Sequence, residues 1–249
     1  TEDNRVRKLD YSIQLSKIFY ERFIKDEEIT LFSPNNVPGL YEAFGLPEFD
    51  DLYIKYENDR KIPKKKVKMQ DLFMDLLKER AETGRIYIMN IDHCNTHSSF
   101  KDKIYMSNLC QEITLPTKPI QHIDDKNGEI ALCILSAVNL GLIKDKDDLE
   151  ELCDLSVRAL DEIIDYQQYP VEAARISTQA RRSLGIGYIG LAHYLAKNKV
   201  KYDDKQALKV VDEITEAFQY YLLKASNTLA KEKGQCEYFD RTKYSDGIL

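Results

Sequence analysis

The sequence predicts a mixed α/β protein whose C-terminal half is dominated by helices. Several segments repeat apolar residues at the 3.6-residue period of an amphipathic helix. Other segments are short runs rich in Ile, Tyr, Val and Leu that are bounded by turn residues, as strands are. The helical segments dominate the second half of the chain, and no repeat or low-complexity segment interrupts them.

The first half of the chain alternates between predicted helices and short strands. A strand-like run at 29–34 ends at Ser-Pro, because the residue before a proline avoids helical geometry. The basic run 61–68 is predicted to be a solvated loop, and Gly84 is placed to end a helix. A strand at 85–92 leads into a polar loop at 93–100. Helices are predicted at 10–24, 49–59 and 69–84.

The second half follows a turn marked by Gly128. The run 130–140 is apolar on both faces, which suits a strand buried on both sides in an α/β fold. A helix over 147–168 opens with acidic residues, where the helix dipole favours them, and Pro170 follows it. Two more helices are predicted over 184–198 and 207–234, and Gly234 ends the last one.

Composition limits the classes of function that fit this chain. A formal net charge of −6 argues against nucleic-acid binding driven by bulk electrostatics. No apolar run is long enough for a membrane span, and the charged N-terminus does not look like a secretion signal. Five widely spaced cysteines favour reduced thiols over a disulfide framework. The sequence therefore predicts a cytoplasmic protein without nucleic-acid or membrane partners.

Two motifs suggest chemistry that their surroundings do not support. Residues 185–190, GIGYIG, match the G-x-G-x-x-G pattern of dinucleotide sites, but no predicted strand precedes them and helices follow. Glycines that let a helix approach its neighbour are the preferred interpretation. His93, Cys94 and His97 are metal-type donors, yet they lie in a predicted loop without a second cluster to complete four ligands. No metal site is predicted.

A third motif lies in SNLCQEITLPTKP, residues 107–119. In an extended chain, residues two apart point to the same side. Asn108, Cys110 and Glu112 would then share one face and bring an amide, a thiol and a carboxylate together. A half-exposed edge strand with a chance cysteine accounts for these residues equally well. The residue types alone therefore leave both interpretations open.

Longer motifs favour the catalytic interpretation through resemblance. Residues 107–119, followed by NGEIALCILSAVNLG at 127–141, resemble the active-site region of the large, catalytic subunit of class I ribonucleotide reductases. The same subunit is resembled, in the same order, by ITLFSPNNVPGLY, ERAETGRIYIMNIDHCNTHS, VRALDEIIDYQQYP and RRSLGIGYIGLAHYLAK. The resemblance covers essentially all 249 residues, although the catalytic subunit of this family is much longer.

This resemblance implies a fold. Residues 1–249 would form an incomplete catalytic domain, part of a ten-stranded α/β barrel with a central finger loop at about 104–116. The barrel would shield a radical from solvent. The glycine-rich segment 185–190 would then be a packed helix start and not a cofactor loop.

The resemblance also implies roles for single residues. Cys110 would carry a thiyl radical that abstracts the 3′ hydrogen of a ribonucleotide, Glu112 would accept the proton of the 3′-hydroxyl, and Asn108 would orient the ribose. Cys133, 23 residues after Cys110 (133 − 110), would be one of two cysteines whose oxidation to a disulfide supplies the reducing electrons. Its partner would lie upstream of this chain. The implied substrate-binding residues are Asn108, Leu109, Cys110, Gln111 and Glu112.

The implied reaction, reduction of ribonucleoside diphosphates to deoxyribonucleoside diphosphates, needs partners. A diiron-tyrosyl small subunit would deliver the radical, and a thioredoxin- or glutaredoxin-type protein would supply reductant, with no cofactor bound by this chain. The remaining segments of the large subunit would also be required, and the complete subunit is expected to be a homodimer. The isolated chain is therefore expected to be inactive.

Two alternatives fit the same residues. In one, the chain is a non-catalytic fragment that serves assembly or regulation of the same subunit. In the other, Cys110 is a thiolate nucleophile activated by a histidine, with Glu112 as the orienting group. Cys94, Cys153 and Cys236 match no role in the family and are expected to be small buried or loop thiols.

Overall fold

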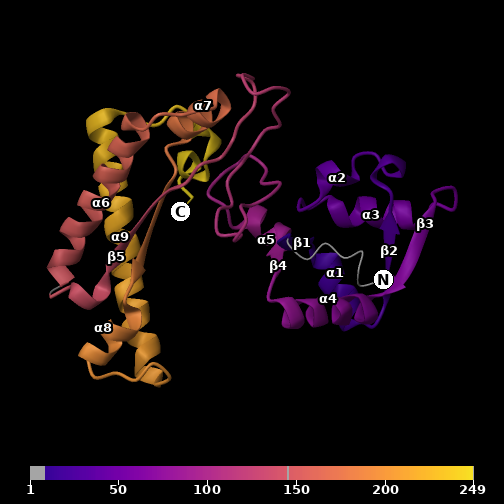
Figure 1. The fold of residues 1–249 in the computed structure, drawn as a ribbon, viewed down its shortest axis with the longest axis horizontal. Coiled ribbons are helices and arrows are strands. Elements are labelled where there is room, and N and C mark those ends of the chain that lie inside the picture. The colour runs from indigo at the N-terminus through magenta and orange to yellow at the C-terminus, as the bar shows by residue number, and fades with distance from the viewer. Residues whose placement is uncertain (1–8, 145, 249) are drawn as a thin grey trace. The chain divides into compact units, whose positions relative to one another are not determined.

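The computed structural model describes residues 9–144 and 146–248, which fall into two compact units. Unit 1 holds the described residues up to Pro116 together with Ile248, and unit 2 holds Thr117–Gly247. The strands of the described residues form three pairs, β1 with β4, β2 with β3 and β5 with β6 (Figure 1). This mixture of strand pairs with helices, the longest in the second half, confirms the predicted α/β class.

Unit 1 is built on two of these strand pairs. β1 (Tyr11–Leu15) runs parallel to β4 (Ile86–Asn90), and β2 (Glu28–Phe32) runs antiparallel to β3 (Lys64–Lys68). The predicted strands at 29–34 and 85–92 are therefore confirmed. The accompanying helices are α1 (Lys17–Ile24), α2 (Leu40–Ala43), α3 (Phe49–Asn58), α4 (Met69–Thr83) and α5 (Ile91–Thr96), with a 3-10 turn at Pro34–Asn36.

The predicted helix over 10–24 is wrong in its first part. Tyr11–Leu15 is a strand, and the helix begins only at Lys17. Leu15 is buried in the core and Ile13 packs against the same cluster. Up to Leu15, the core-facing side chains therefore follow the two-residue spacing of a strand. Pairing with β4, more than 70 residues later, decides this segment. The later helices α3 and α4 are as predicted, and Gly84 ends α4 in the left-handed region at φ 67°.

The predicted loop in the basic run 61–68 is also wrong, because Lys64–Lys68 forms β3. Lys64 has a structural role there. Its ammonium donates to the carbonyl oxygens of Glu57 at 2.5 Å and Asp59 at 2.7 Å, at the carboxyl end of α3. A cation at this position satisfies carbonyls that lack intrahelical partners and is favoured by the helix dipole.

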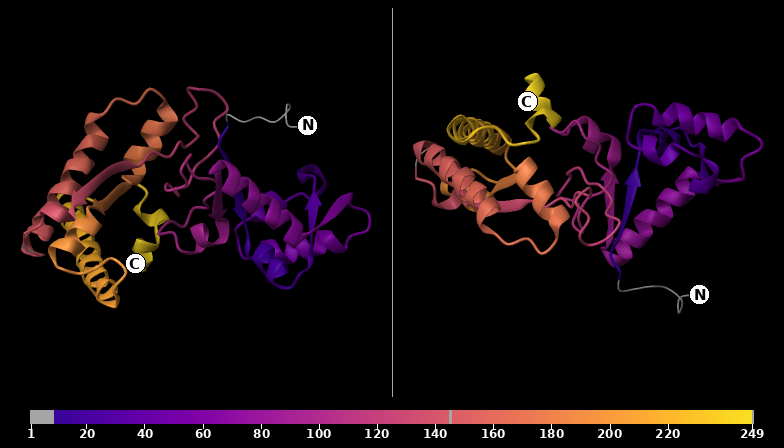
Figure 2. Two further views of the ribbon diagram at one scale, coloured as in Figure 1. Left: turned by 60° about the horizontal axis from the view of Figure 1, so that its bottom comes forward. Right: turned by 90° about the horizontal axis from the view of Figure 1, so that it is seen from above.

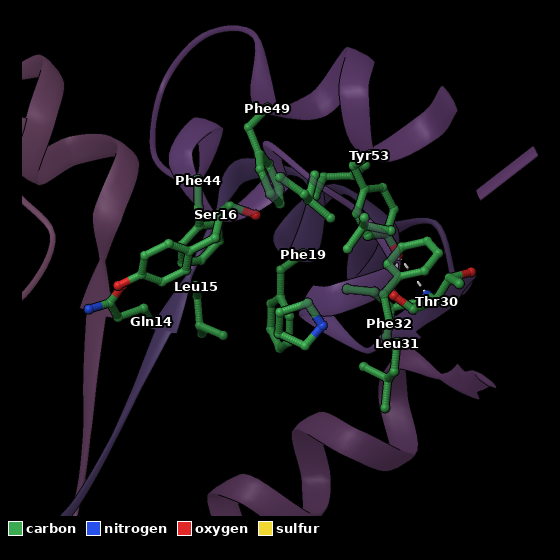
Figure 3. A pocket seen from close by; sticks show the side chains of 16 residues that line it. Gln14, Leu15, Ser16, Phe19, Thr30, Leu31, Phe32, Phe44, Phe49 and Tyr53 are labelled. Atoms are coloured by element: carbon green, nitrogen blue, oxygen red, sulfur yellow. Dashed lines mark hydrogen bonds between the residues drawn. The ribbon is translucent and has the colours of Figure 1, made fainter. Parts of the chain in front are cut away.

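The core of unit 1 surrounds the Tyr53 side chain, as Figure 3 shows. The Tyr53 hydroxyl donates to the carbonyl oxygen of Thr30 at 2.8 Å and accepts from its backbone N–H at 2.6 Å. Both residues are buried, so the hydroxyl satisfies two backbone groups of β2 that water does not reach. A mostly apolar pocket of about 420 Å³ lies in this cluster, among Leu15, Phe19 and other core side chains.

Unit 2 is organised around the parallel pair β5 (Ile134–Asn139) and β6 (Leu184–Ile189). The two long helices α6 (Lys146–Tyr166) and α9 (Lys205–Lys233) run side by side in Figures 1 and 2. Their shared core contains Leu149, Cys153, Ile214 and Phe218. The remaining elements are α7 (Glu172–Arg181), α8 (Leu191–Lys197) and 3-10 turns at Leu140–Leu142, Phe239–Arg241 and Lys243–Asp246.

Two predictions for unit 2 need correction. Residues 185–190 are not a helix start, because Leu184–Ile189 is strand β6 and α8 begins only at Leu191, after Gly190 at φ 75°. The strand forms because its whole length pairs with β5. The run 130–140 does contain the predicted strand, but Leu135 is 59% exposed, so this strand is not buried on both sides.

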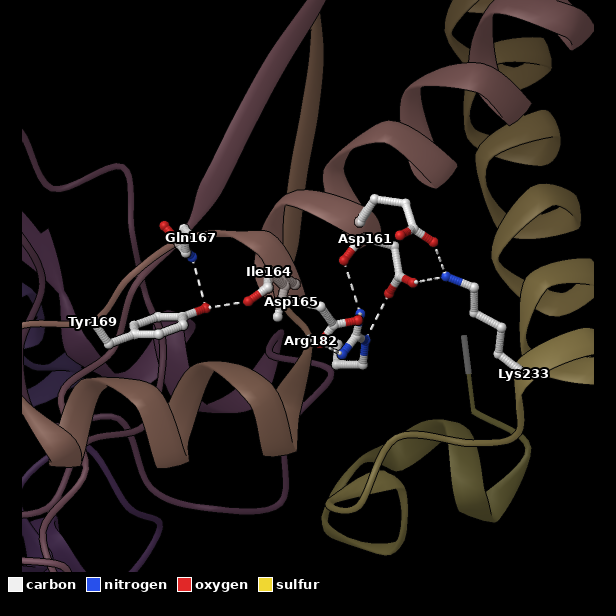
Figure 4. Close-up of polar contacts among 8 residues, drawn as sticks. Asp161, Ile164, Asp165, Gln167, Tyr169, Arg182 and Lys233 are labelled. Atoms are coloured by element: carbon white, nitrogen blue, oxygen red, sulfur yellow. Dashed lines mark hydrogen bonds and ion pairs between the residues drawn. The ribbon is translucent and has the colours of Figure 1, made fainter.

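An ion-pair network ties α6, α9 and the connection from α7 to β6 together (Figure 4). Arg182 donates to Asp161 at 2.6 Å and to Asp165 at 2.8 Å, both on α6. Lys233, at the end of α9, reaches the other oxygen of Asp161 at 3.1 Å. The Asp161 carboxylate is buried and shared by two cations, which is how a buried charge is compensated. The network fixes the turn that leads into β6.

Candidate functional site

The candidate loop at 104–116 is held firmly where it leaves the core of unit 1. The side-chain oxygen of Asn95, on α5, accepts from the backbone N–H of Ile104 at 2.8 Å. Its side-chain nitrogen donates to the carbonyl oxygen of Ile104 at 3.1 Å. One residue later, Gln14 on β1 donates to the carbonyl oxygen of Tyr105 at 2.8 Å. Ile104 is fully buried, so these bonds fix the start of the loop to two core elements.

The tip of the loop is a tight turn closed by the Asn108 side chain. The backbone N–H of Gln111 donates to the carbonyl oxygen of Asn108 at 3.1 Å, and Gln111 lies in the left-handed region at φ 62°. The side-chain oxygen of Asn108 accepts from the N–H of Ile113 at 3.0 Å. Ser107 donates to the carbonyl oxygen of Ile113 at 2.7 Å, which closes the turn from the other side. Asparagine favours such turns because its side chain can replace a backbone partner.

This turn corrects the prediction that Asn108, Cys110 and Glu112 share one face of an extended strand. Their common alternation is interrupted between residues 108 and 111, where the chain reverses. All three residues are nevertheless exposed, and Leu109 is exposed with them. The structure therefore keeps the three polar groups on one short, accessible loop, although a turn and not a strand pleat brings them there.

The Cys110 thiol is exposed at the tip of this turn and makes no hydrogen bond within the part of the chain that the structure describes. His93 and His97, the histidines of unit 1, make no hydrogen bond to it, so this unit does not show the pairing that the thiolate-nucleophile alternative needs. The neighbouring Gln111 side chain turns inward, and its buried oxygen has no hydrogen-bond partner among the described residues. Within unit 1, the Cys110 thiol is therefore accessible and has no hydrogen-bonded base.

A polar pocket of about 190 Å³ lies beside the tip. One wall is formed by Ser107, Asn108 and Leu109, and the other comes from the start of β1. The residues of this second wall are Asp10, which precedes β1, and Tyr11 and Ser12 in it, and the sequence analysis did not single them out. They lie about a hundred residues earlier, and no local pattern links them to the loop. The pocket of about 420 Å³ in the core of unit 1 contains none of the candidate residues.

Cys133, the predicted redox cysteine, is half-buried in unit 2 and comes directly before β5. Strand β6 passes close to it, because a Cβ atom added to Gly185 would lie 2.9 Å from the Cys133 sulfur. The first glycine of the G-x-G-x-x-G pattern thus leaves space for this thiol. Close packing accounts for that position, but the sequence analysis expected a helix to approach its neighbour there, whereas the packed element is strand β6.

The histidine pair on α5 also differs from its predicted surroundings. His93 lies in α5 and His97 directly follows it, so their spacing of four is helical and their rings lie 5.4 Å apart. The predicted loop was therefore wrong, and helical spacing no longer argues against a metal. A complete site would need further ligands, and the described residues contain no group of three metal-type side chains.

The other cysteines are plain packed thiols, as expected. All five cysteines are thiols, without disulfides. Cys153 is fully buried in the core of unit 2, and burial raises the pKa of its thiol to about 11. Burial also raises the pKa values of Cys94 and Cys236 above the ordinary value.

Comparison with known proteins identifies the class. A family described as "Ribonucleotide reductase, barrel domain" matches residues 1–249, and the chain belongs to this family. Ribonucleoside-diphosphate reductase subunit alpha of Haemophilus influenzae is 60% identical over 253 residues, which cover all of this chain and 34% of that protein. The Escherichia coli reductase 1 subunit alpha is 56% identical, and the phage T4 subunit alpha is 43% identical, each with 33% covered. The predicted family is confirmed.

The chain is much shorter than these relatives. It spans about a third of the length of the curated relatives it matches. In the described residues, no helix is both long and apolar enough to cross a membrane. The match to the barrel-domain family agrees with the α/β class, while the described strands form three separate pairs and no closed sheet.

Proposed function

We propose that this chain supplies the central active-site residues for reducing ribonucleoside diphosphates to deoxyribonucleoside diphosphates. The observation that carries the proposal is the exposed Cys110 thiol at the tip of an anchored loop, flanked by Asn108 and Glu112. The relatives that match the whole chain are alpha subunits of ribonucleoside-diphosphate reductase. Radical chemistry at a thiol requires access to the substrate and no thiolate, which agrees with the surroundings of Cys110.

Each of these residues has its own role in the proposed reaction. The Cys110 thiyl radical takes the 3′ hydrogen atom from the ribose, and the Glu112 carboxylate accepts the proton of the 3′-hydroxyl. The 2′-hydroxyl then leaves as water with a proton from one of two redox thiols, and the hydrogen of the other thiol goes to C2′. Glu112 returns its proton to the 3′ oxygen, and Cys110 returns its hydrogen atom to C3′, which regenerates the thiyl radical. Two thiols, Cys133 and a second cysteine outside this chain, become a disulfide and so supply the two electrons. The stretch 108–112 contacts the substrate, and Asn108 both orients the ribose and closes the turn.

We further propose that both units belong to one incomplete barrel domain over 1–249, part of a ten-stranded α/β barrel with its finger loop at about 104–116. The parallel pairs β1–β4 and β5–β6 support this, because parallel strands are usually buried inside larger sheets. The remaining two-thirds of the subunit, a second copy of it and a small diiron-tyrosyl subunit complete the enzyme. A thioredoxin- or glutaredoxin-type protein re-reduces it, in the cytoplasm.

The test is Cys110→Ser in the complete alpha subunit, with the small subunit, a dithiol reductant and a ribonucleoside diphosphate. Turnover is expected to fall to background, because a serine hydroxyl does not form the radical. The matched control is Cys236→Ser, which changes a half-buried thiol outside the candidate loop and should retain most of the turnover. Circular dichroism and subunit association are measured for both variants.

Three outcomes distinguish the proposed function from its alternatives. Lost turnover with normal folding and association supports the proposal. Retained turnover in Cys110→Ser would refute it. Loss of association together with turnover would favour the alternative in which this segment serves assembly.

A further inference from the structure

Glu129 carries a buried carboxylate that joins separate segments of unit 2. Its oxygens accept from Arg181, the last residue of α7, at 2.5 Å and from Lys118 at 2.8 Å. Arg241, in the turn Phe239–Arg241, lies at 3.3 Å. The guanidinium groups of Arg181 and Arg241 also lie over the ring of Tyr238, 5.1 and 4.0 Å from its centre. The Glu129 carboxylate therefore lies among three cations, two of which also contact an aromatic ring.

The Glu129 carboxylate is buried and yet remains charged. The side chains of Glu129 and Arg181 are 2% and 3% exposed. Burial alone would favour the neutral acid, but the hydrogen bonds from Lys118 and Arg181 outweigh it and hold the pKa of Glu129 below its usual value. A charged carboxylate with several partners resists displacement, because moving it away would break its ion pair with the buried Arg181 guanidinium.

The ion pair between Glu129 and Arg181 links the segment that leads into β5 to the segment that leads into β6, and Cys133 lies in the first of them. Strand pairing between β5 and β6 begins with Ile134 opposite Leu184. Glu129 precedes Ile134 by five residues (134 − 129), and Arg181 precedes Leu184 by three (184 − 181). The two short segments are thus fixed to each other at both ends, by an ion pair at one and by backbone pairing at the other. Cys133 is the residue just before the paired end.

Glu129 also fixes the chain that comes from the finger loop. Its backbone pairs with that of Lys118 through two hydrogen bonds, of 3.0 and 3.1 Å. The excursion between them is compact, because Asp125 accepts from the N–H groups of Gln121 and Asn127 at 2.9 and 2.8 Å. The carboxylate therefore joins both ends of this excursion to α7. One end, Lys118, lies eight residues after Cys110, and the other, Glu129, lies four residues before Cys133.

We propose that Glu129 is a positioning residue for Cys133: it fixes the short segment that carries this thiol into β5, so that the sulfur keeps one placement against β6. The importance of that placement for reduction rests on the proposed function, since only there is Cys133 a redox group. The placement itself is a property of unit 2 and is measured without turnover.

The experiment measures thiol alkylation in the reduced full-length protein, with iodoacetamide and peptide mass spectrometry. Glu129→Gln keeps the shape of the side chain and removes its charge. We expect alkylation of Cys133 to become about tenfold faster, since weakening charged hydrogen bonds by ~1.4 kcal/mol changes a local opening equilibrium by that factor. Cys153, fully buried in the same unit, should keep its rate, because it reports opening of the whole core.

Two further variants sharpen the result. Glu129→Asp retains the charge and should restore much of the protection of Cys133. If Glu129→Gln does not fold, Lys118→Gln replaces it as the test, because it removes a charged hydrogen bond from the same carboxylate and should also speed the alkylation of Cys133. Glu150→Gln removes an exposed carboxylate paired with Lys224 on α9 and should leave Cys133 unchanged. Equal alkylation of Cys133 in the Glu129→Gln variant and the unchanged protein would overturn the proposal. So would a parallel rise at Cys133 and Cys153, because global destabilisation alone would then suffice.

The redox role is tested apart from the positioning role. Turnover by Cys133→Ser in the complete enzyme with a thioredoxin-type reductant should be lost. Retained turnover would refute the role of Cys133 in the proposed function and leave the alkylation result standing. Faster alkylation of Cys133 in Glu129→Gln would still support the positioning role.

Discussion

Replacing Gly185 by alanine tests the close approach of β6 to the predicted redox thiol. The added Cβ atom would lie 2.4 Å from a methyl carbon of Leu135 and 2.9 Å from the Cys133 sulfur, where ordinary contacts begin near 3.4 Å. Leu135 is 59% exposed, so its side chain can turn away at little cost. Cys133 is half-buried and must move by about half an ångström (3.4 − 2.9) or displace β6.

The expected cost of Gly185→Ala is about 1–2 kcal/mol of unfolding free energy, in the lower part of the range for overpacking. Gly187→Ala is the matched control, because it lies two residues along the same strand and its added Cβ would meet no atom within 4 Å. That variant should be neutral or more stable by up to about 1 kcal/mol, since alanine restricts the unfolded chain.

Urea unfolding followed by circular dichroism measures both variants, with the slope against urea concentration checked for constancy. The stability order should be Gly187→Ala above Gly185→Ala. In thermal unfolding, each kcal/mol of difference should appear as ~2–4 °C in the melting temperature. Equal stability of the two alanine variants would refute the packing argument, because the two substitutions differ only in what the new methyl group meets.

Two other predictions concern unit 1. Tyr53→Phe should cost about 1–3 kcal/mol in urea unfolding, because the buried backbone N–H and carbonyl of Thr30 lose their partner. Tyr20→Phe should cost less than about 1 kcal/mol, because Tyr20 is half-buried and its hydroxyl makes a single exposed hydrogen bond, to the Asn90 side chain. The hydrogen bonds from Arg22 to Glu57, of 2.5 and 2.7 Å, hold the pKa of Glu57 below its usual value. This pair should therefore stabilise the protein at neutral pH, and its contribution should disappear as pH falls below about 4.3 and through the folded-state pKa. The stability difference between the unchanged protein and Glu57→Gln should narrow between pH 7 and pH 3, and a constant difference would contradict this sign.

The long helices could be predicted because their signal is local. In α4, α6 and α9, apolar residues recur at helical spacing over 15 residues or more, and glycine follows α4 and α9. Tertiary contacts then only select which face is buried. No distant partner is needed to decide that these segments are helical.

The strands β1, β3 and β6 were missed because distant partners determine them. In β3, Val67 is the single apolar residue among lysines, and the strand exists through its register with β2. In β6, glycines weaken any strand signal, yet Gly185 is needed where the strand passes Cys133. These features depend on neighbours far along the chain, which a local pattern does not contain.

The candidate site was predicted in its residue types and not in its geometry. Alternation of polar residues suggested a strand, whereas the Asn108 side chain and the positive φ of Gln111 produce a turn. An asparagine three residues before Gln111 is a turn signal that could have been given more weight. The pocket wall at Asp10–Ser12 had no signal, because its contact with the loop exists only in the folded unit.

The two hydrogen bonds between the Asn95 side chain and the Ile104 backbone separate the anchoring of the candidate loop from the side chains at its tip. With Ile104 and Pro116 both buried, the loop between them is fixed at its two ends, while its tip packs little. Substitutions at the tip should therefore change its exposed side chains with little penalty to the core. The side chains of such a loop can change one at a time during evolution, because each substitution leaves the anchored ends of the loop intact.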